Sequence, residues 1–483
     1  MGFAARTALL FALALSTLGA NRNDPLTGLL QRMNAAAGPV WRTRFISVSR
    51  LTLGREQNVV STDSEGLRIT VRHCTGELCS GTYFDGTHLY SVNMNGTALP
   101  ETLQPEPFLR ALRLVASLQF LAPSFLAQGG RIGASGDASY GGRRYHTLVV
   151  GAVNAVPLRL YVDPDTSLVR VAREVGGRET FEYRDYRRIG PFNLPFTVLH
   201  DGELFERYDD RTPVSSPYEP PRGMAAALRG TPQTVPTDPN AVTPIVDCSV
   251  GGIAVRCLVD SGNSGISMSS ELASQLGAPV VGTYQIRGLG GYQTQVVRAG
   301  PLRIGNATYP GAYYAVLTDL RRYGYDVVLG ADVLAATSVE FDAAAHAIRF
   351  GVPIAKSRIT VPVSFENFIP VIDVGLGPVQ TSLAVDTGDE SNINLTYDFY
   401  GKHPGLFSVT QRRSVSGIGG SSVELIGEIP QVRIGDYRTG PQRIGTTQSL
   451  AATAFGHVGA AFLQQFVVQL DYASAQLHLT PRS

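Results

Sequence analysis

The sequence has very little lysine and almost no net charge. Only Lys356 and Lys402 stand against abundant arginine, a bias typical of GC-rich bacterial genomes. The formal net charge at pH 7 is +1, and charged residues make up 17% of the chain. A balance of this kind provides no strong field to attract nucleic acid or an anionic membrane surface. We therefore expect neither of them as a partner.

Several motifs that would indicate other chemistry are absent. The chain has no Gly-x-Ser-x-Gly elbow, no phosphate-binding loop and no His-Glu-x-x-His zinc helix. A zinc site built from His73, Cys74 and Cys79 would lack a credible fourth ligand. The sequence therefore predicts no metal and no cofactor.

Long apolar runs are also missing, including at the N-terminus. Residues 1–20 place Arg6 before a short apolar run at 8–15, which is typical of a secretory signal and too short to span a bilayer. Residues 17–20 are similar to a lipid-attachment motif but lack its cysteine. We expect an exported bacterial protein, periplasmic or secreted, with no membrane span.

From about residue 240 the chain consists of two similar copies of one unit. Apolar runs end in Asp260-Ser261-Gly262 and in Asp386-Thr387-Gly388, and the two aspartates are 126 residues apart. Each run follows a strand that turns at glycine. A glycine-rich loop, an apolar-apolar-glycine segment and a closing strand pair come next in both copies. The loops contain Gly288, Leu289, Gly290 and Gly291 in the first copy and Gly417, Ile418, Gly419 and Gly420 in the second. Such a repeat predicts two lobes with approximate twofold symmetry inside a monomer.

The repeated aspartates suggest acid–base chemistry. Amide hydrolysis needs a base to take a proton from water and an acid to protonate the substrate oxygen. Two carboxyls held close together share one proton, because both cannot ionise cheaply. Asp260 and Asp386 are the predicted catalytic pair. Gly262 and Gly388 would allow the turns to approach closely, and Ser261 and Thr387 would bond across them. The alternative is an ordinary turn, where Asp-Ser/Thr-Gly is also common.

Residues 240–483 resemble the aspartic peptidases, most closely the retropepsin-like branch, with both lobes fused in one chain. The resemblance implies a mainly β, bilobal double-barrel fold and endopeptidase activity on an extended peptide or protein. The two glycine-rich loops would be flaps that bind substrate by strand addition. Asn263 and Asp389 depart from the family, which often has Ala or Ser there. An inward Asp389 would raise the pKa of a neighbouring carboxyl.

The four cysteines fit an oxidising compartment and allow three pairings. Local closure favours Cys74 with Cys79, and Cys248 with Cys257. For the second pair the alternative is two apolar positions, because Val374 and Leu383 occupy the same places in the second copy.

Residues 24–210 predict a curved antiparallel sheet with one or two helices. Asp24 and Pro25 mark the start of a helix over 26–36, and apolar spacing predicts another over 108–121. Strand-like runs include 158–162 and 169–174. Motifs near Asp163-Pro164-Asp165 loosely resemble periplasmic lipoprotein-sorting and carrier proteins, which hold acyl chains. The same motifs fit equally well a curved antiparallel sheet that has no such function. The resemblance implies a lipid or lipoprotein partner here.

The predicted organisation is a signal peptide at 1–20, a β-sheet domain at 24–210, a linker at 211–243, and lobes at 244–355 and 356–483. The linker contains seven prolines, so we expect it to be extended. Cleavage there would make the N-terminal region a propeptide. The alternative function is a catalytically inactive, protease-like binding scaffold with a lipid- or lipoprotein-binding N-terminal domain. A structural or assembly role would require a blocked cleft.

Overall fold

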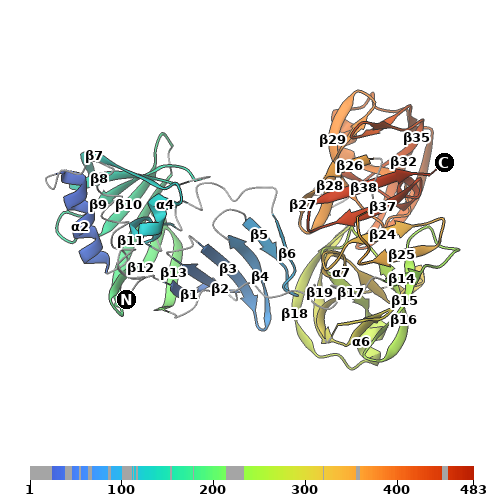
Figure 1. Ribbon diagram of the computed structural model, residues 1–483, viewed down its shortest axis with the longest axis horizontal. Coiled ribbons are helices and arrows are strands. Elements are labelled where there is room, and N and C mark those ends of the chain that lie inside the picture. The colour runs from blue at the N-terminus through green and yellow to red at the C-terminus, as the bar shows by residue number, and fades with distance from the viewer. Residues whose placement is uncertain are drawn as a thin grey trace. The chain divides into compact units, whose positions relative to one another are not determined.

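The structure is a computed structural model. It describes residues 24–38, 46–53, 56–63, 68–84, 89–100, 111, 114–115, 118–152, 155–177, 179–213, 233–309, 311–318, 320–354, 359–448 and 455–482. The predicted signal peptide lies outside the described residues, and so does the linker between 214 and 232. Most of this part of the chain is β-strand, which confirms the mainly β prediction (Figure 1). No helix within the described ranges is long and apolar enough to cross a membrane.

The chain forms two compact units. The first takes in described residues of 1–75, 81–90 and 103–219, and the second those of 76–80, 91–102 and 220–483. The second unit therefore includes two short segments from the region predicted as a separate N-terminal domain. They fall in β4 (Leu78–Phe84), β5 (Leu89–Val92) and β6 (Ala98–Pro100).

In the first unit, antiparallel strands follow the order β3-β2-β1-β13-β12-β11-β10-β9-β8-β7. Their bounds are β1 (Ile46–Leu53), β2 (Glu56–Asp63), β3 (Arg68–Thr75), β7 (Arg131–Tyr140), β8 (Arg143–Gly151), β9 (Leu158–Val162), β10 (Val169–Glu174), β11 (Thr180–Ile189), β12 (Phe192–His200) and β13 (Glu203–Pro213).

Helix α2 (Pro25–Ala37) confirms the predicted N-terminal helix. Its first turn is capped because Asp24 accepts hydrogen bonds from the N–H groups of Leu26 and Thr27. Its buried face contributes Leu29 and Met33 to the core of this unit. Half of the residues in the helix predicted over 108–121 lie outside the described residues. The part described there includes the short helix η1 (Gln119–Leu121), followed by α4 (Pro123–Ala127).

The second unit contains two large sheets whose strands correspond in order. The nine-stranded sheet runs β18-β19-β22-β17-β23-β16-β15-β20-β21, and the ten-stranded sheet runs β31-β32-β35-β30-β36-β29-β28-β33-β34, with β27 beside β28.

The nine-stranded sheet has β15 (Ile245–Val250), β16 (Ile253–Val259), β17 (Ile266–Ser269), β18 (Val280–Arg287), β19 (Gly291–Ala299), β20 (Leu302–Ile304), β21 (Ala307–Tyr309), β22 (Ala312–Leu317) and β23 (Val327–Leu329). The ten-stranded sheet has β27 (Ser364–Glu366), β28 (Ile369–Leu376), β29 (Val379–Val385), β30 (Ile393–Thr396), β31 (Gln411–Gly417), β32 (Gly420–Ile429), β33 (Val432–Ile434), β34 (Tyr437–Arg438), β35 (Gln442–Thr447) and β36 (Gly456–Val458). Short helices accompany these strands: α6 (Ser270–Gln275), η2 (Leu320–Tyr323), α7 (Ala331–Leu334), α8 (Tyr397–Lys402) and α9 (Ala460–Leu463).

A third sheet of six strands joins the closing strand pairs of the two copies (Figure 1). Its order is β14 (Gln233–Pro236), β25 (Ala347–Phe350), β24 (Val339–Asp342), β37 (Phe466–Asp471), β38 (Gln476–Pro481) and β26 (Ile359–Pro362). Antiparallel pairing of β24 with β37 connects the halves, and one apolar core extends through them. The predicted linker differs from the structure at its end. Gln233 and Val235 are buried because β14 pairs with β25.

Candidate active site

A strand pair on each side delivers one aspartate. The hairpin of β15 and β16 ends at Val259, and β16 lies parallel to β23. The Asp260 N–H donates to the carbonyl of Leu329, 2.9 Å away, at the end of that parallel ladder. The hairpin of β28 and β29 repeats this arrangement beside β36, where the Asp386 N–H donates to Val458 over 3.0 Å. Both aspartates therefore leave a buried strand at equivalent points.

The two carboxyls face one another between these turns. A β-carbon built on Gly262 would lie 2.5 Å from the carboxyl carbon of Asp386, and one built on Gly388 would overlap the carboxyl of Asp260. Only glycine fits such an approach. Each glycine also fixes its own turn, because the Gly262 N–H donates to Asp260 Oδ1 over 2.7 Å and the Gly388 N–H donates to Asp386 Oδ1 over 3.0 Å.

Ser261 and Thr387 connect the turns through four crossed hydrogen bonds. The Thr387 hydroxyl donates to the carbonyl of Val259 over 2.8 Å and accepts from the Ser261 N–H over 3.0 Å. The Ser261 hydroxyl donates to the carbonyl of Val385 over 2.6 Å and accepts from the Thr387 N–H over 3.0 Å. Both side chains are buried. Buried bonds of this kind fix the spacing of the carboxyls, since water cannot replace them.

Burial sets the acidity of the pair. Desolvation, and then the charge of Asp386, raise the pKa of Asp260 well above its usual range. Desolvation also raises the pKa of Asp386, although a positive charge on His457 opposes the rise. A hydrogen bond between the carboxyls raises the pKa of Asp260 and lowers that of Asp386. The pair is thus arranged to hold one proton between two oxygen acids.

The two glycine-rich loops form hairpin tips that touch. Gly288 to Gly291 lie where β18 turns into β19, and Gly417 to Gly420 lie where β31 turns into β32. The Leu289 N–H donates to the carbonyl of Ile418 over 2.9 Å. Ile418 also packs beside a small apolar cluster that contains Leu258 and Val328. The two tips approach so closely that a β-carbon on Gly290 or on Gly419 would collide with the backbone of the opposite tip.

Sequence reasoning missed His457. Its Nε2 lies 2.5 Å from Asp389 Oδ2, and both side chains are about one quarter exposed, at 24% and 28%. The available signal was that histidine occupies an apolar position of the repeated apolar-apolar-glycine segment. Whether its ring would face the dyad depended on strand pairing that the pattern alone does not give.

Two clusters bring metal-ligand atoms within 4.8 Å of one another in the part of the chain described: Glu179 with His200 and Asp201, and Asp386 with Asp389 and His457. In each, the histidine Nε2 directly faces a carboxylate, Glu179 or Asp389. We therefore interpret both clusters as histidine–carboxylate contacts and not as metal sites.

All four cysteines are in disulfides. Cys248 and Cys257 join β15 to β16, with their Cα atoms 6.0 Å apart, and Cys74 and Cys79 are disulfide-bonded as well. The first disulfide ties together the hairpin that leads into Asp260, so it belongs to the support of the site.

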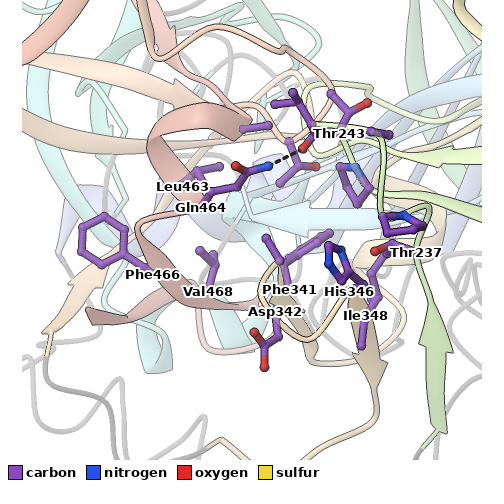
Figure 2. Close-up of a pocket in the computed structure, with 18 of the residues that line it drawn as sticks. Thr237, Thr243, Phe341, Asp342, His346, Ile348, Leu463, Gln464, Phe466 and Val468 are labelled. Atoms are coloured by element: carbon purple, nitrogen blue, oxygen red, sulfur yellow. Dashed lines mark hydrogen bonds between the residues drawn. The ribbon is translucent and has the colours of Figure 1, made fainter. Parts of the chain in front are cut away.

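A separate pocket of ≈ 350 Å³ lies against the six-stranded sheet (Figure 2). Phe341, Ile348, Phe466 and Val468 give it apolar walls, and Gln464 bridges one side by donating to the carbonyl of Val242 over 2.8 Å. Thr387 is among its lining residues, whereas neither Asp260 nor Asp386 is. The pocket therefore reaches the turn that carries Asp386 but is not lined by either carboxyl.

Comparison with known proteins finds one matching family. Residues 246–333 match the family model described as aspartyl protease. The matched segment contains Asp260, the first glycine-rich tip and the strand β23, which pairs with β16 next to the Asp260 turn. No curated protein matches the chain significantly. Residues 246–333 are thus an aspartic-protease-like domain, and this domain supplies the first of the two facing carboxyls.

Proposed function

We propose that this protein is an aspartic endopeptidase that hydrolyses peptide bonds with a water molecule held between Asp260 and Asp386. One observation carries the proposal: two carboxyls from equivalent turns face each other and are locked by the Ser261 and Thr387 hydroxyls. Two ordinary turns would not need to bury such a network between them.

The chemistry follows from one shared proton. The ionised carboxylate takes a proton from water as the water oxygen attacks the peptide carbonyl carbon, and the protonated carboxyl gives its proton to the carbonyl oxygen. In the second half, the newly protonated carboxyl transfers its proton to the departing nitrogen. The other carboxylate takes a proton from the gem-diol as the C–N bond breaks. The dyad then holds one proton again.

The two hairpin tips would close over the substrate. The strands β18, β19, β31 and β32 offer backbone donors and acceptors, which suit a substrate in an extended conformation. Both aspartates come from one chain, so the site needs no second copy and we propose a monomer. The lobes at 244–355 and 356–483 would be the two copies of a fused retropepsin-like fold.

We also propose export to the periplasm or the cell exterior of a bacterium. The signal-like residues 1–20 and the disulfide between Cys248 and Cys257 support this location. A lipid or lipoprotein on the N-terminal sheet stays a prediction, which mass spectrometry of co-purified acyl chains would test.

The test is digestion of a mixed peptide library between pH 3 and 8, with and without pepstatin. We expect wild type to cleave and Asp386→Asn to lose cleavage while its thermal unfolding is kept. Asp373→Asn is the matched control, because that aspartate is exposed on β28 and its carboxylate accepts a hydrogen bond from Ser382 within its own hairpin. A folded wild type that cleaves nothing at any pH would contradict the proposal and favour the inactive scaffold.

A further inference from the structure

The turn that carries Asp386 has an ion pair beside it. The His457 imidazole lies against Asp389 Oδ2, and the other oxygen of Asp389 accepts from the Ser391 N–H over 2.5 Å. The Asp389 N–H in turn donates to Asp386 Oδ1 over 3.1 Å. Ligand-type atoms of Asp386, Asp389 and His457 all lie within 4.8 Å of one another. The pair is therefore in direct electrostatic reach of one catalytic carboxyl.

The equivalent positions beside Asp260 are neutral. Strand β36 pairs His457 with Ala384, just as β23 pairs Val328 with Leu258, so Val328 is the counterpart of His457. Val328 is buried in an apolar cluster. Asn263 is the counterpart of Asp389, and within the described residues its amide bonds two neutral groups, the Ser267 hydroxyl and the Gly265 N–H. Charged side chains therefore lie beside the Asp386 turn, whereas the corresponding positions beside the Asp260 turn are neutral.

The charges of this cluster have definite signs. Burial alone would lower the pKa of His457, but the Asp389 carboxylate, followed by Asp386 and Asp260, raises it to about 9. His457 is therefore an imidazolium at neutral pH, and its positive charge holds the pKa of Asp389 well below the usual range despite burial. Asp389, Asp386 and Asp260 are the charged groups that act on this imidazole.

The ion pair acts unequally on the two catalytic carboxyls. At Asp386 the His457 imidazolium lowers the pKa more than the Asp389 carboxylate raises it, so the pair as a whole favours a negative charge there. At Asp260 the Asp389 carboxylate raises the pKa, and so disfavours a negative charge. Tyr325 also faces the dyad, but burial and the nearby Asp260 keep its phenol neutral by raising its pKa. Glu390 acts on Tyr325 and is exposed, so solvent screens its charge.

We propose that His457 and Asp389 are positioning residues that place the negative charge of the dyad on Asp386 and the shared proton on Asp260. Asp386 is then the general base that receives the proton of water, and Asp260 is the general acid that protonates the peptide carbonyl. This inference rests on the proposed peptidase function and assigns the two roles within it.

The test compares pH profiles of kcat/KM for single and double variants. His457→Asn removes a cation, so the acid limb should move up by about one pH unit. Asp389→Asn removes an anion, so the same limb should move down by about as much. The double variant has two neutral residues, like Asn263 and Val328, and should return the limb close to the wild-type position. Shifts of both single variants in one direction would overturn the proposal, because a purely structural role gives no opposite signs.

A second measurement does not depend on activity. The imidazole signal that disappears in His457→Asn identifies His457 in NMR spectra, and its titration can be followed in wild type and in Asp389→Asn. We expect a pKa near 9 in wild type and a clear fall in Asp389→Asn. A wild-type value near 6.5 would overturn the inference even if peptides are cleaved. Absence of cleavage with the expected titration would instead contradict the peptidase function and leave the charge pair established.

Discussion

Two buried hydroxyl groups, on Ser261 and Thr387, hold the turns that carry the dyad. A valine at 387 keeps the shape of threonine but loses the hydroxyl. The Val259 carbonyl and the Ser261 N–H would then both lack their partner inside the protein. Unpaired buried groups cost roughly 1–3 kcal/mol each, so we expect Thr387→Val to lower the free energy of unfolding by about 2–4 kcal/mol and to lower kcat as well.

Urea unfolding and steady-state kinetics would check this expectation. Thr387→Ser is the matched control, because it retains the hydroxyl and places in the second turn the residue that the first turn already has at 261. A Thr387→Val protein with wild-type stability and kcat would show that the crossed bonds do not set the geometry of the site.

At the scale of single residues, the sequence pattern identified the two aspartates that the repeat contains. It missed His457, which has no histidine counterpart in the first copy. Asp260 and Asp386 could be proposed because each ends an apolar run inside a matching pattern. Asp389 could be noted only as a departure from the family's usual Ala or Ser, and the sequence did not show whether its side chain faces the dyad. His457 occupies a position that is apolar in the first copy, and its contact with Asp389 depends on how β29 pairs with β36. Pairing between distant strands is not encoded in a local pattern.

The hairpin tips are the elements whose contact depends most on glycine. Gly419 has a φ of 84°, and a β-carbon there would lie 2.6 Å from the carbonyl carbon of Gly290. Gly419→Ala should therefore keep the tips apart and strain the turn. Because closure of such elements completes a site and excludes water, we expect kcat/KM to fall by about tenfold or more with little change in melting temperature.

The control for this change is Gly401→Ala, since a β-carbon there meets no atom within 4 Å and the φ of Gly401 is not positive. Both variants would be assayed with the same peptide and by thermal unfolding. Equal activity of Gly419→Ala and Gly401→Ala would mean that the tips need not meet for cleavage.

Elements were predicted best where their pattern is local. The strands at 158–162 and 169–174 and the capped helix α2 follow from alternation and from Asp24 with Pro25. Strand β14 was missed, because it is short and lies among prolines (Pro232, Pro236 and Pro239), which is typical of a linker. The strand forms because β25 has an edge with which Gln233 and Val235 can pair. The local sequence around β14 does not reveal that edge, since β25 lies more than a hundred residues later.

At the scale of the whole molecule, the strand orders of the two large sheets correspond, as do the two copies in the sequence. The contact between Asp332 and residues 93–97 could not be predicted, because no pattern in the sequence relates these distant segments. Asp332 is a buried residue of α7. The start of α7 is bonded to the turn that follows Asp260, because the Ala331 N–H donates to the carbonyl of Asn263 over 2.9 Å. Asn93 and Asn95, more than two hundred residues earlier, each donate a side-chain N–H to its carboxylate over 2.7 Å, and the Thr97 hydroxyl donates over 2.5 Å. The same amides bond the carbonyls of Ser264 and Tyr313.

These contacts make residues 93–97 part of the second unit. Burial raises the pKa of Asp332, and the three side-chain donors oppose that rise. Without the donors a buried carboxylate would lack hydrogen-bond partners, which destabilises the folded state.

We therefore expect Asn93→Ala combined with Asn95→Ala to lower the free energy of unfolding by about 2–4 kcal/mol. Adding Asp332→Leu to that pair should restore part of the loss, because it removes the unpaired charge. Urea unfolding of the full chain measures both, with Asn306→Ala, an exposed asparagine of the same unit, as control. A double variant as stable as this control would mean that the segment merely rests on the surface, and that the unit from residue 233 onward stands without it.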